Sequence, residues 1–404
     1  MLNQYFIPEP GAGTSRVFYY AKFLKENGHD VTVISGVPNY PDGKIHKGYK
    51  NQPFLKEDLD GIKIYRTLVF PTKYTNNLRR FLNYLIFTIS SFLVGIFIRR
   101  PDLIIASSPP PSAGVTALLL SYLKHAPLIF EVRDVWPGAA KALGFLKNPF
   151  LLQLNLFFEK RIYKRSKYLI TVTEDTKEII LSENPFLLRN KIKVVTNGVD
   201  LDVFDSLKSK ISKGKIKTKF TVIYTGTLGL QQGVDTLAET ATLLKNNSNI
   251  IFLVYGDGAS RGLLDEVKKK KRLDNLILND VVSYKKVVDS IKSADLGLTI
   301  LKKNKYLDAA YPVKAFDYMA AAKPILVSGS IAMKNLIEKY NLGYWVQPEK
   351  PDLLAEKILE ISTQSKDKLG EFGHNGRRII EKEFNRRKQA EKILEILDEI
   401  ETKR

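Results

Sequence analysis

The amino-acid sequence predicts an α/β protein made of two Rossmann-like, doubly wound domains that face each other across a cleft. The chain has 404 residues, which fits two domains of about 150 to 200 residues better than one compact core. Short apolar runs alternate with longer helical patterns in both halves, as in parallel sheets covered by helices. A Lys/Ser-rich stretch without apolar periodicity separates the halves. We therefore expect an N-terminal domain at 1–204, a linker at 205–219, a second domain at 220–385 and a helix at 386–404 that packs back on the body.

The first half contains a series of predicted strands that stop at polar or glycine-rich residues. They are LNQYFI, DVTVISG, DLIIASS, PLIFEVRD, YLITVT and IKVVTNG. The first of them begins almost at Met1, so we expect a few residues upstream of it. A helix over 15–27 follows the first strand and its Pro/Gly loop, with Val17, Tyr20 and Leu24 on one face. Because parallel strands end at one edge of a sheet, the loops after these strands should line the cleft.

The second half repeats this pattern. Its predicted strands are FTVIYTGTLG, NIIFLVYGDG, a run near Leu276, ADLGLTIL and KPILVSG, with a helix beginning at Gly233. The last helix, about 386–402, carries Ile393, Leu394 and Leu397 on one face. Such a face predicts packing against the rest of the protein.

Composition excludes several kinds of chemistry. Hydrophobic residues make up 44% and charged residues 26% of the chain, as in ordinary soluble proteins. The absence of cysteine excludes disulfides, thiolate nucleophiles and Cys-ligated metals. The four histidines are scattered without a metal-binding spacing, so we expect neither a metal nor another cofactor: His29, His46, His125 and His374. Proline and glycine interrupt the start before a signal peptide could form, which predicts a cytoplasmic location.

Two loops have the features of phosphate sites. A glycine loop between a strand and a helix presents backbone N–H groups at the positive end of a helix dipole. The first loop is Gly11-Ala12-Gly13, with Arg16 one turn into the helix. The second begins at Gly226 and Thr227. Neither matches the nicotinamide fingerprint, and glycine is also common in ordinary tight turns.

The order of several motifs gives a more specific signal. AKFLKENGHDVTVIS, TNGVDLDVF, VIYTGTLGLQQGVDTL, VYGDG and YPVKAFDYMAAAKPIL occur in the order and rough spacing of the family-four retaining glycosyltransferases. This resemblance covers nearly the whole chain and implies the GT-B fold. EPGAG, PNYPDGKIHKGY and EVRDVWP resemble the subgroup that makes capsule, colanic-acid and O-antigen glycans, including N-acetylfucosaminyl transferases. Together these resemblances imply that the protein transfers a sugar from a nucleotide diphosphate sugar, with a UDP-sugar favoured, to a glycan acceptor.

The resemblance also implies donor-binding residues. KAFDYMA is similar to the family's K-x-x-E-Y-M-A motif, whose carboxylate binds the ribose hydroxyls of the donor. The resemblance therefore implies that Asp317 binds these hydroxyls, although aspartate is shorter than the usual glutamate. The family's earlier glutamate falls on Ala309, with Asp308 beside it. Where relatives carry an Arg and a Lys that clamp the diphosphate, this chain has Thr227 and Gln232. We therefore expect Lys314, helped by the backbone amides of the Gly226 loop, to supply the charge, unless Lys314 is an ordinary solvated lysine.

The acceptor side is expected at EVRDVWP, where Arg133, Asp134 and Trp136 follow a first-domain strand. Asp134 and Glu9 are the candidate catalytic carboxylates. Packing of Trp136 and pairing of Arg133 with Asp134 are the structural alternatives. Relatives are thought to react on one face of the sugar with help from the leaving phosphate, so the resemblance implies neither a hydrolase-like carboxylate pair nor a metal.

The net charge of +20 predicts anionic partners. The stretch 61–101 has seven cations and no acidic residue, and residues 81–98 within it are almost wholly apolar. Because predicted strands of one sheet lie on both sides of this run, we expect a helix against the domain that docks residues 77–100 on the inner, anionic membrane surface, near a lipid-linked acceptor. A fully buried core helix is the alternative.

Two other functions are compatible with parts of the sequence. A nucleotide-sugar epimerase on the same fold would also bind a nucleotide in the second domain. A nucleic-acid binder is suggested by the charge alone, but the chain has no recognition module and no aromatic-basic repeat, so nucleic acid is not an expected partner.

Overall fold

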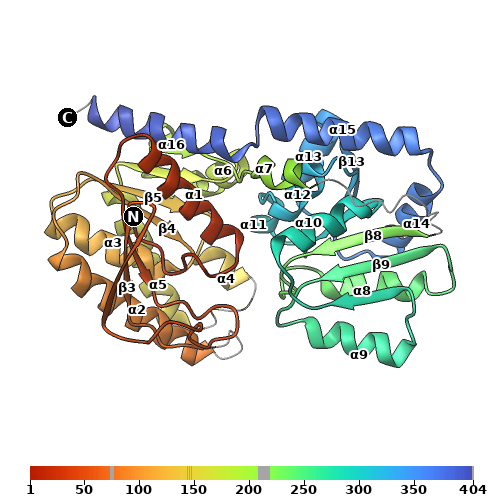
Figure 1. Cartoon of the computed structure of the whole chain (residues 1–404), viewed down its shortest axis with the longest axis horizontal. Helices are drawn as coiled ribbons and strands as arrows, with labels where there is room; N and C mark the ends of the chain where they lie inside the picture. Colours follow the sequence, from red (N-terminus) through yellow and green to blue (C-terminus); the bar gives the residue numbers. More distant parts are fainter. Residues whose placement is uncertain (73–76, 143, 145, 147, 208–218, 403–404) are drawn as a thin grey trace. The chain divides into compact units, whose positions relative to one another are not determined.

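The computed structural model describes residues 1–72, 77–142, 144, 146, 148–207 and 219–402 (Figure 1). The chain forms two compact units, Met1–Thr196 with Gln389–Arg404, and Asn197–Lys388. Each unit has parallel strands and helices, which confirms the predicted α/β class with two Rossmann-like domains.

The unit boundaries differ from the predicted ones. The first unit ends at Thr196 rather than at residue 204, because the short helix α7 (Leu201–Ser206) packs in the second unit. Phe204 of α7 is buried there, and the Val199 N–H donates to the Phe384 carbonyl over 2.9 Å. The predicted linker 205–219 overlaps the end of α7, and residues 208–218 lie outside the described part of the chain.

The chain returns to the first unit at its end. Helix α16 (Arg386–Glu401) begins in the second unit, and from Gln389 onward it belongs to the first. Ile393, Ile396 and Leu397 are buried against residues of the first sheet and of α1 (Ala12–Glu26). The expected packing of this helix on the body is therefore packing on the first unit specifically.

The first unit is built on a mostly parallel set of strands: β1 (Thr32–Gly36), β2 (Phe54–Leu59), β3 (Ile62–Thr67), β4 (Ile104–Ser108), β5 (Leu128–Val132), β6 (Tyr168–Thr171) and β7 (Ile192–Val194). Residues 1–4 lie between β1 and β4, since Leu2 makes parallel bridges to Ile34 and Ala106. The predicted first strand is thus reduced to a bridge, and the chain then turns where the Glu9 N–H donates to the Phe6 carbonyl. The spatial order is β2, β3, β1, residues 1–4, β4, β5, β6, β7, with only β2 antiparallel.

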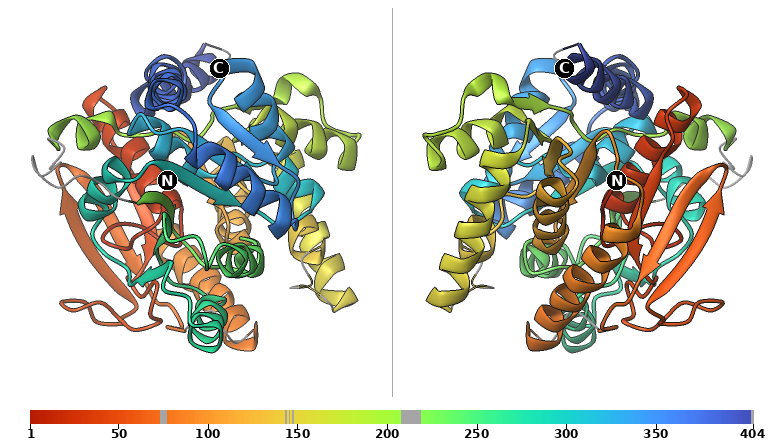
Figure 2. Two further views of the ribbon diagram at one scale, coloured as in Figure 1. Left: turned by 90° about the vertical axis from the view of Figure 1, so that its right-hand side faces the viewer. Right: turned by 90° about the vertical axis from the view of Figure 1, so that its left-hand side faces the viewer.

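Helices cover the first sheet. Besides α1 and α16 they are α2 (Asn77–Phe97), α3 (Pro111–Leu123), α4 (Gly138–Ala142), α5 (Pro149–Arg165) and α6 (Glu174–Glu183), and a 3-10 turn precedes β7 at Arg189–Lys191. Figure 2 shows α3 between α2, in orange, and α5, in yellow. The core beneath α1 and α16 holds Val17, Tyr20 and Leu24, the face predicted for the first helix.

The second unit has one wholly parallel sheet: β8 (Phe220–Thr225), β9 (Ile250–Tyr255), β10 (Leu276–Asn279), β11 (Leu296–Ile300), β12 (Ile325–Ser328) and β13 (Gly343–Val346). The strands lie in the order β10, β9, β8, β11, β12, β13. This is the doubly wound order in which the chain direction across the sheet reverses between its first and fourth strands, β8 and β11. A crevice at the carboxyl ends of these two strands is the usual ligand site of such sheets.

Nine helices of the described chain belong to the second unit: α7, α8 (Val234–Leu243), α9 (Arg261–Lys271), α10 (Tyr284–Ser293), α11 (Lys305–Asp308), α12 (Val313–Ala320), α13 (Ile331–Tyr340), α14 (Pro351–Ser362) and α15 (Lys366–Lys382). Two separate apolar clusters pack around the sheet. One surrounds α8 and α14, and the other contains residues of α10, α12, α13 and α15.

Helix α2 contains the long apolar run of the first half. Of the described helices it alone is long and apolar enough, at Leu78–Phe97, to cross a membrane by length and composition. One of its faces packs on the first unit: Phe87 is buried, and the Ser91 hydroxyl lies 3.0 Å from that of Thr116 on α3. The opposite face is exposed, so α2 is neither a fully buried core helix nor detached from the domain. The predicted helix lying against the domain is confirmed, and its contact with lipid stays a prediction.

The first testable prediction concerns the return of the chain in α16. Ile393→Ala should destabilise the first unit by about 2–5 kcal/mol, because it removes a buried side chain and leaves a cavity. Native-state hydrogen exchange should show the loss of protection in β4, β5 and β6. Glu395→Ala, on the exposed side of the same helix, is the control and should change little. Loss of protection mainly in β8 and β11 would contradict the assignment of α16 to the first unit.

Candidate functional site

Two glycine-containing loops form the carboxyl edge of the second sheet next to β8. A Cβ added at Gly256 would lie 1.9 Å from the Gly226 carbonyl oxygen, and one at Gly258 would lie 2.5 Å from that of Leu228. Both glycines also have positive φ angles, 150° and 155°. The GDG sequence is therefore required for the loop after β9 to pack against the loop after β8.

The backbone amides of the loop after β8 are only partly available. The Gly226 N–H donates to the Tyr255 carbonyl and the Leu228 N–H to that of Asp257, both over 2.9 Å. The expectation that the Gly226 amide binds phosphate is thus wrong, because this amide completes the sheet edge. Thr227 is exposed, and its N–H makes no hydrogen bond to any described residue. Of the Gly226 and Thr227 amides, the Thr227 amide is therefore the one that can reach a ligand.

Tyr318 fixes helix α12 against the two central strands. Its buried hydroxyl accepts a hydrogen bond from the Thr225 N–H over 2.9 Å and donates to the Leu298 carbonyl over 3.2 Å. A Cβ at Gly297 would lie 2.3 Å from the Tyr318 ring, so only glycine lets the ring lie on β11. This packing holds the start of α12, with Lys314 and Asp317, beside the ends of β8 and β11.

Lys314 lies at this edge in a largely enclosed position. Its ammonium group lies 3.7 Å from the centre of the Tyr224 ring and donates to Gln232 Oε1 over 3.0 Å. The Tyr224 hydroxyl in turn donates to the Thr227 carbonyl over 2.9 Å. Desolvation lowers the pKa of Lys314 to about 7. Its packing on Tyr224 and its hydrogen bond to Gln232 make Lys314 a partly buried residue, unlike an ordinary solvated lysine on a helix surface, and its contact with a diphosphate stays a prediction.

Asp317 is one turn further along α12. Its Oδ1 accepts a hydrogen bond from the Tyr284 hydroxyl over 2.7 Å. Desolvation raises the pKa of Asp317 to about 6, although Tyr284 and the charge of Arg386 lower it. The second oxygen of this carboxylate can accept from a ligand hydroxyl, as the ribose assignment requires. Asp308 lies at the end of α11, after β11, where it is partly exposed, and no hydrogen bond between described residues joins its carboxylate to Lys314 or Asp317.

In the first unit, helix α1 begins at the predicted glycine loop. Gly11 is its N-cap residue with a φ of 135°, and the helix starts at Ala12, three residues before the predicted start. A Cβ at Gly13 would lie 1.6 Å from an Arg133 guanidinium nitrogen. Arg133 also donates to the carbonyls of Ser108 and Pro109, over 3.2 and 2.9 Å. The predicted loop residues and Arg133 are therefore brought together where β4 and β5 end.

Arg16 does not point into this loop. Its Nε lies 2.8 Å from Glu131 Oε1 in a buried ion pair, and its other nitrogens donate to the carbonyls of Val195 and Thr196. Although burial opposes ionisation of Glu131, the charges of Arg16 and Arg133 lower its pKa overall. The prediction that Arg16 binds phosphate is a misassignment, because its side chain points away from the loop and contacts Glu131 on β5 and the carbonyls that follow β7.

Glu9 is likewise not placed for catalysis. It is buried, and its oxygens accept the N–H groups of Phe6, Asn39 and Tyr40 over 2.8–3.1 Å. Burial raises its pKa, although these hydrogen bonds and the charge of Arg66 oppose the shift. Glu9 therefore orders the two loops that follow residues 1–4 and β1, and the prediction that it faces an acceptor is wrong.

Asp134 and Trp136 lie directly after β5. Asp134 is exposed, so of the two candidate catalytic carboxylates it is the one that a ligand can reach. The Trp136 indole N–H is buried and finds no hydrogen-bond partner among the described residues. No salt bridge between described residues joins Arg133 to Asp134, but desolvation raises the pKa of Asp134 and the charge of Arg133 opposes this shift, so the two groups interact and their pairing stays an alternative.

Comparison with protein families agrees with this geometry. Residues 13–203 match the model described as Glycosyltransferase Family 4, and residues 205–379 match that described as Glycosyl transferases group 1. With two Rossmann-like units and these two matches, the protein is a glycosyltransferase of the GT-B fold. More particularly, the chain belongs to the family-four glycosyltransferases.

Relatives and solved structures are similar over most of the chain. WcaI of Escherichia coli (strain K12), described as a glycosyl transferase of colanic acid biosynthesis, is 24% identical, with 83% of this chain and 85% of WcaI covered. TuaH of Bacillus subtilis (strain 168), described for teichuronic acid biosynthesis, is 24% identical over 60% of this chain and 61% of its own. Sucrose-phosphate synthase of Thermosynechococcus elongatus superposes with a TM-score of 0.78 at 15% identity, covering 98% and 94% of the two chains. Anabaena HepE, solved with UDP, gives 0.69 at 14% identity, covering 98% of each. At such identities these structures show the fold alone.

Sequence reasoning missed two tyrosines of the second-unit site. Tyr224 lies in the predicted strand FTVIYTGTLG, and because β8 is buried along nearly its whole length, a run of this kind could have indicated a buried ring. Tyr284 precedes Asp317 by 33 residues, and its hydrogen bond to Asp317 depends on how α10 packs against α12. No spacing in the sequence carries that signal.

The second prediction concerns the pH dependence of donor binding. Asp317 is ionised above about pH 6, and Lys314 is protonated below about pH 7. If Asp317 accepts the ribose hydroxyls and Lys314 binds the diphosphate, affinity for a nucleotide sugar should be highest between these values and fall on both sides. Asp317→Asn should remove the acid limb and Lys314→Met the alkaline limb, as measured by calorimetry. Asp317→Ala should weaken binding by about 1–3 kcal/mol, as for other hydrogen bonds to charged groups.

A nucleotide sugar suits this experiment because its diphosphate is a diester without a titrating oxygen near neutral pH. The bare nucleoside is the matched ligand: Lys314→Met should hardly affect its binding, whereas Asp317→Asn should affect both ligands. Equal losses for the two ligands in Lys314→Met would show a structural lysine.

Proposed function

We propose that the protein transfers a sugar from a UDP-sugar to a glycan acceptor carried on a lipid, with retention of the anomeric configuration. We further propose that it works in the cytoplasm, at the inner face of the cell membrane, in the biosynthesis of a surface polysaccharide. The observation that carries the donor side is the presence of a cation, Lys314, and a carboxylate, Asp317, one turn apart on α12 beside the ends of β8 and β11. Doubly wound sheets usually bind nucleotides at the carboxyl ends of their two central strands.

The donor assignment uses the chemistry of the two groups. A desolvated lysine beside the exposed Thr227 N–H suits the two phosphates, and a carboxylate with one free oxygen suits a pair of sugar hydroxyls. HepE, which shares the fold, has been solved with UDP and with UDP-glucose. Both features support a UDP-sugar, with Lys314, Asp317 and Thr227 as binding residues and Asp308 as a candidate for the sugar.

The acceptor assignment uses the first unit. Asp134, Arg133 and the start of α1 at Gly11 to Gly13 lie at the strand ends of that sheet and form the proposed acceptor side. WcaI and TuaH are described for the biosynthesis of colanic acid and of teichuronic acid, which supports a glycan acceptor. The exposed apolar face of α2 supports a lipid anchor on that acceptor.

The donor is tested by thermal shift with UDP-, GDP- and dTDP-sugars, since a ligand that binds the native state alone raises its stability, by about 2.7 kcal/mol at one hundred times the Kd. Transfer is then tested with the stabilising donor and a lipid-linked acceptor, with and without EDTA, and the product anomer is read by NMR. We expect retention and no effect of EDTA. A donor sugar that isomerises without any acceptor would instead identify an epimerase, and an inverted product would overturn retention.

The third prediction concerns the membrane. Arg79, Arg80, Arg99 and Arg100 flank the exposed apolar face of α2, and each cation near an anionic leaflet contributes about 1 kcal/mol. The protein should co-sediment with anionic vesicles at low salt, much less at high salt, and hardly with neutral vesicles. Replacing the four arginines by glutamine should reduce this binding by orders of magnitude.

The control removes the same charge elsewhere. Residues 268–271 of α9 are four consecutive lysines in the second unit, and changing them to glutamine should leave vesicle binding nearly unchanged. Equal losses in both variants would mean that net charge, and not the α2 face, attracts the protein. No binding to anionic vesicles at low salt would contradict membrane docking.

A further inference from the structure

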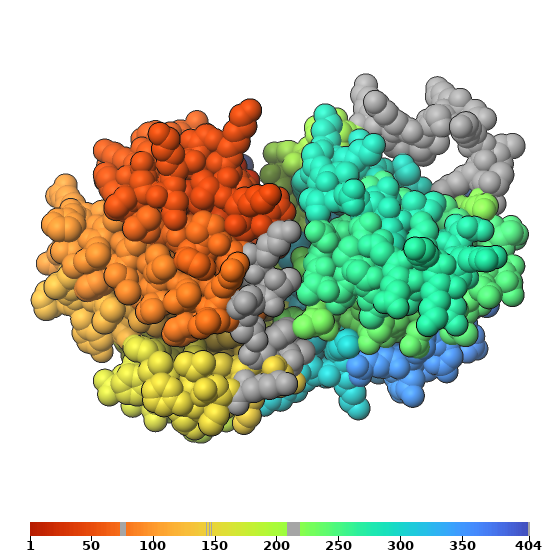
Figure 3. Space-filling view, turned by 90° about the horizontal axis from the view of Figure 1, so that it is seen from below, coloured from red at the N-terminus to blue at the C-terminus, as the bar shows by residue number. Residues whose placement is uncertain are grey.

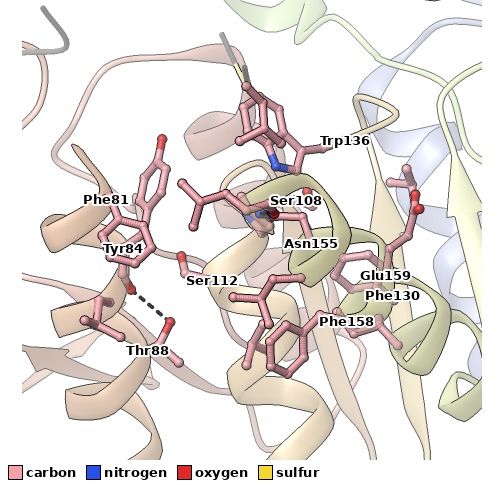
Figure 4. Close-up of a pocket in the computed structure, with 18 of the residues that line it drawn as sticks. Phe81, Tyr84, Thr88, Ser108, Ser112, Phe130, Trp136, Asn155, Phe158 and Glu159 are labelled. Atoms are coloured by element: carbon pink, nitrogen blue, oxygen red, sulfur yellow. Dashed lines mark hydrogen bonds between the residues drawn. The ribbon is translucent and has the colours of Figure 1, made fainter. Parts of the chain in front are cut away.

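The first unit contains a pocket that neither the nucleotide site nor the acceptor loop explains. It has a volume of about 330 Å³ and lies between α2, α3 and α5 (Figure 4). This is within the range of about 300–1,000 Å³ that is typical of small-molecule pockets. Its walls are mainly apolar, with Phe81 and Leu85 from α2, Val115 from α3, and Leu154 and Phe158 from α5.

The pocket opens on the surface that is proposed to meet the membrane. Phe81, Leu85 and Leu154 line it and are also among the exposed large hydrophobic residues. Seen from below in Figure 3, α2, in orange, and α5, in yellow, lie on one face of the first unit. Further exposed hydrophobic residues continue this face along the same helices: Ile89, Leu93, Phe97, Phe150 and Phe157.

The other end of the pocket lies at the strand ends. Trp136, after β5, and Ser108, at the end of β4, both line it, and Figure 4 shows Trp136 at the end opposite Thr88 and Phe158. The Ser108 carbonyl accepts a hydrogen bond from the Arg133 guanidinium. The pocket therefore runs from the exposed apolar face to the residues that form the proposed acceptor side.

We propose that this pocket holds the first part of the hydrocarbon chain of the lipid-linked acceptor, with the polar head at the Trp136 end and the rest of the chain leaving between α2 and α5 into the membrane. The inference rests on the proposed function and adds where the lipid lies. The occupant is expected to be apolar because the walls are apolar, and its polar end is placed near Ser108 and Trp136 because these lining residues lie at the strand ends beside the proposed acceptor side.

Among the described residues of the wall there is one carboxylate, and it is compatible with such an occupant. Glu159 on α5 has its pKa raised to about 7 by desolvation, and Tyr163 forms a hydrogen bond with it that opposes the shift. At neutral pH a large fraction of Glu159 is therefore uncharged. A hydrocarbon chain can lie against a protonated carboxyl group at much lower cost than against a carboxylate.

Tryptophan fluorescence can report the occupant directly. The chain has two tryptophans, so Trp345→Phe leaves Trp136, in the pocket wall, as the only one. The probe is oleyl phosphate brominated across its double bond, used below its micelle-forming concentration, with unbrominated oleyl phosphate as control. Bromine quenches tryptophan on contact, so we expect saturable quenching by the brominated chain only. Absence of quenching would overturn the proposal.

Two pairs of variants separate the pocket from the outer face. Val115→Phe fills the pocket, whereas Leu119→Phe adds the same ring one turn further along α3 at an exposed site outside it. Leu154→Gln places an amide in the pocket mouth, and Leu156→Gln does so at an equally exposed position of α5 outside the pocket, since the two leucines are 38% and 37% exposed. In each pair the first variant should lower the affinity for the brominated probe at least tenfold, and the second variant should not. Equal effects within both pairs would show a chain on the surface only.

Transfer kinetics connect this site to the reaction. Val115→Phe should raise the KM for a lipid-linked acceptor at least tenfold and leave the KM for a water-soluble acceptor without a chain unchanged. Retained thermal stabilisation by the nucleotide sugar shows that the variant is folded. The quenching assay needs no donor, so failure of quenching with intact transfer would refute the pocket alone, whereas quenching without any transfer would refute the proposed function.

Discussion

Parallel strands that end at a common edge are the constraint on which both halves of this protein depend. In the second unit β8 and β11 are neighbouring strands, and the chain continues from them into opposite halves of the sheet, so the segments that follow them leave the space between their ends uncovered. In the first unit residues 1–4 and β4 hold the equivalent central position. The charged side chains that are candidates for ligand binding lie at these edges: Lys314 and Asp317 in one unit, and Arg133 and Asp134 in the other.

Buried polar contacts then fix what the topology leaves open. Arg16 and Glu131 join α1, β5 and the end of β7, and Tyr318 joins α12 to β8 and β11. Breaking a buried ion pair by removing one partner commonly costs 3–5 kcal/mol, because the remaining charge is left uncompensated. Such contacts hold the loop at Gly13 and the start of α12 rigidly enough for a ligand site.

The sequence could predict the strands and the edge but not the direction of the side chains. Most predicted strands end within a few residues of the observed ones, since apolar runs bounded by glycine or polar residues reflect burial. Arg16 and Glu9 were assigned to a ligand from their nearness to a glycine loop, yet both turn into the protein, where partners distant in the sequence bind them. The hairpin of β2 and β3 was missed although Asp60-Gly61, both with positive φ, is a recognised signal for a two-residue turn. The observed unit boundary lies before the predicted one because Phe204 is buried in the second unit. The composition of the neighbouring sequence does not indicate that contact.

The departure from the family's diphosphate clamp has a physical consequence. An arginine at this edge would stay charged whether or not a ligand were bound, and a desolvated charge without an anion is costly. Lysine can release its proton, and desolvation lowers the pKa of Lys314, which favours this release. In the proposed function the arriving diphosphate would restore the charge, so that binding is coupled to uptake of a proton. Above the lowered pKa of Lys314 this protonation costs part of the binding free energy, so the preference for a nucleotide sugar over an uncharged nucleoside would weaken as the pH rises, whereas a permanently charged arginine would show no such dependence.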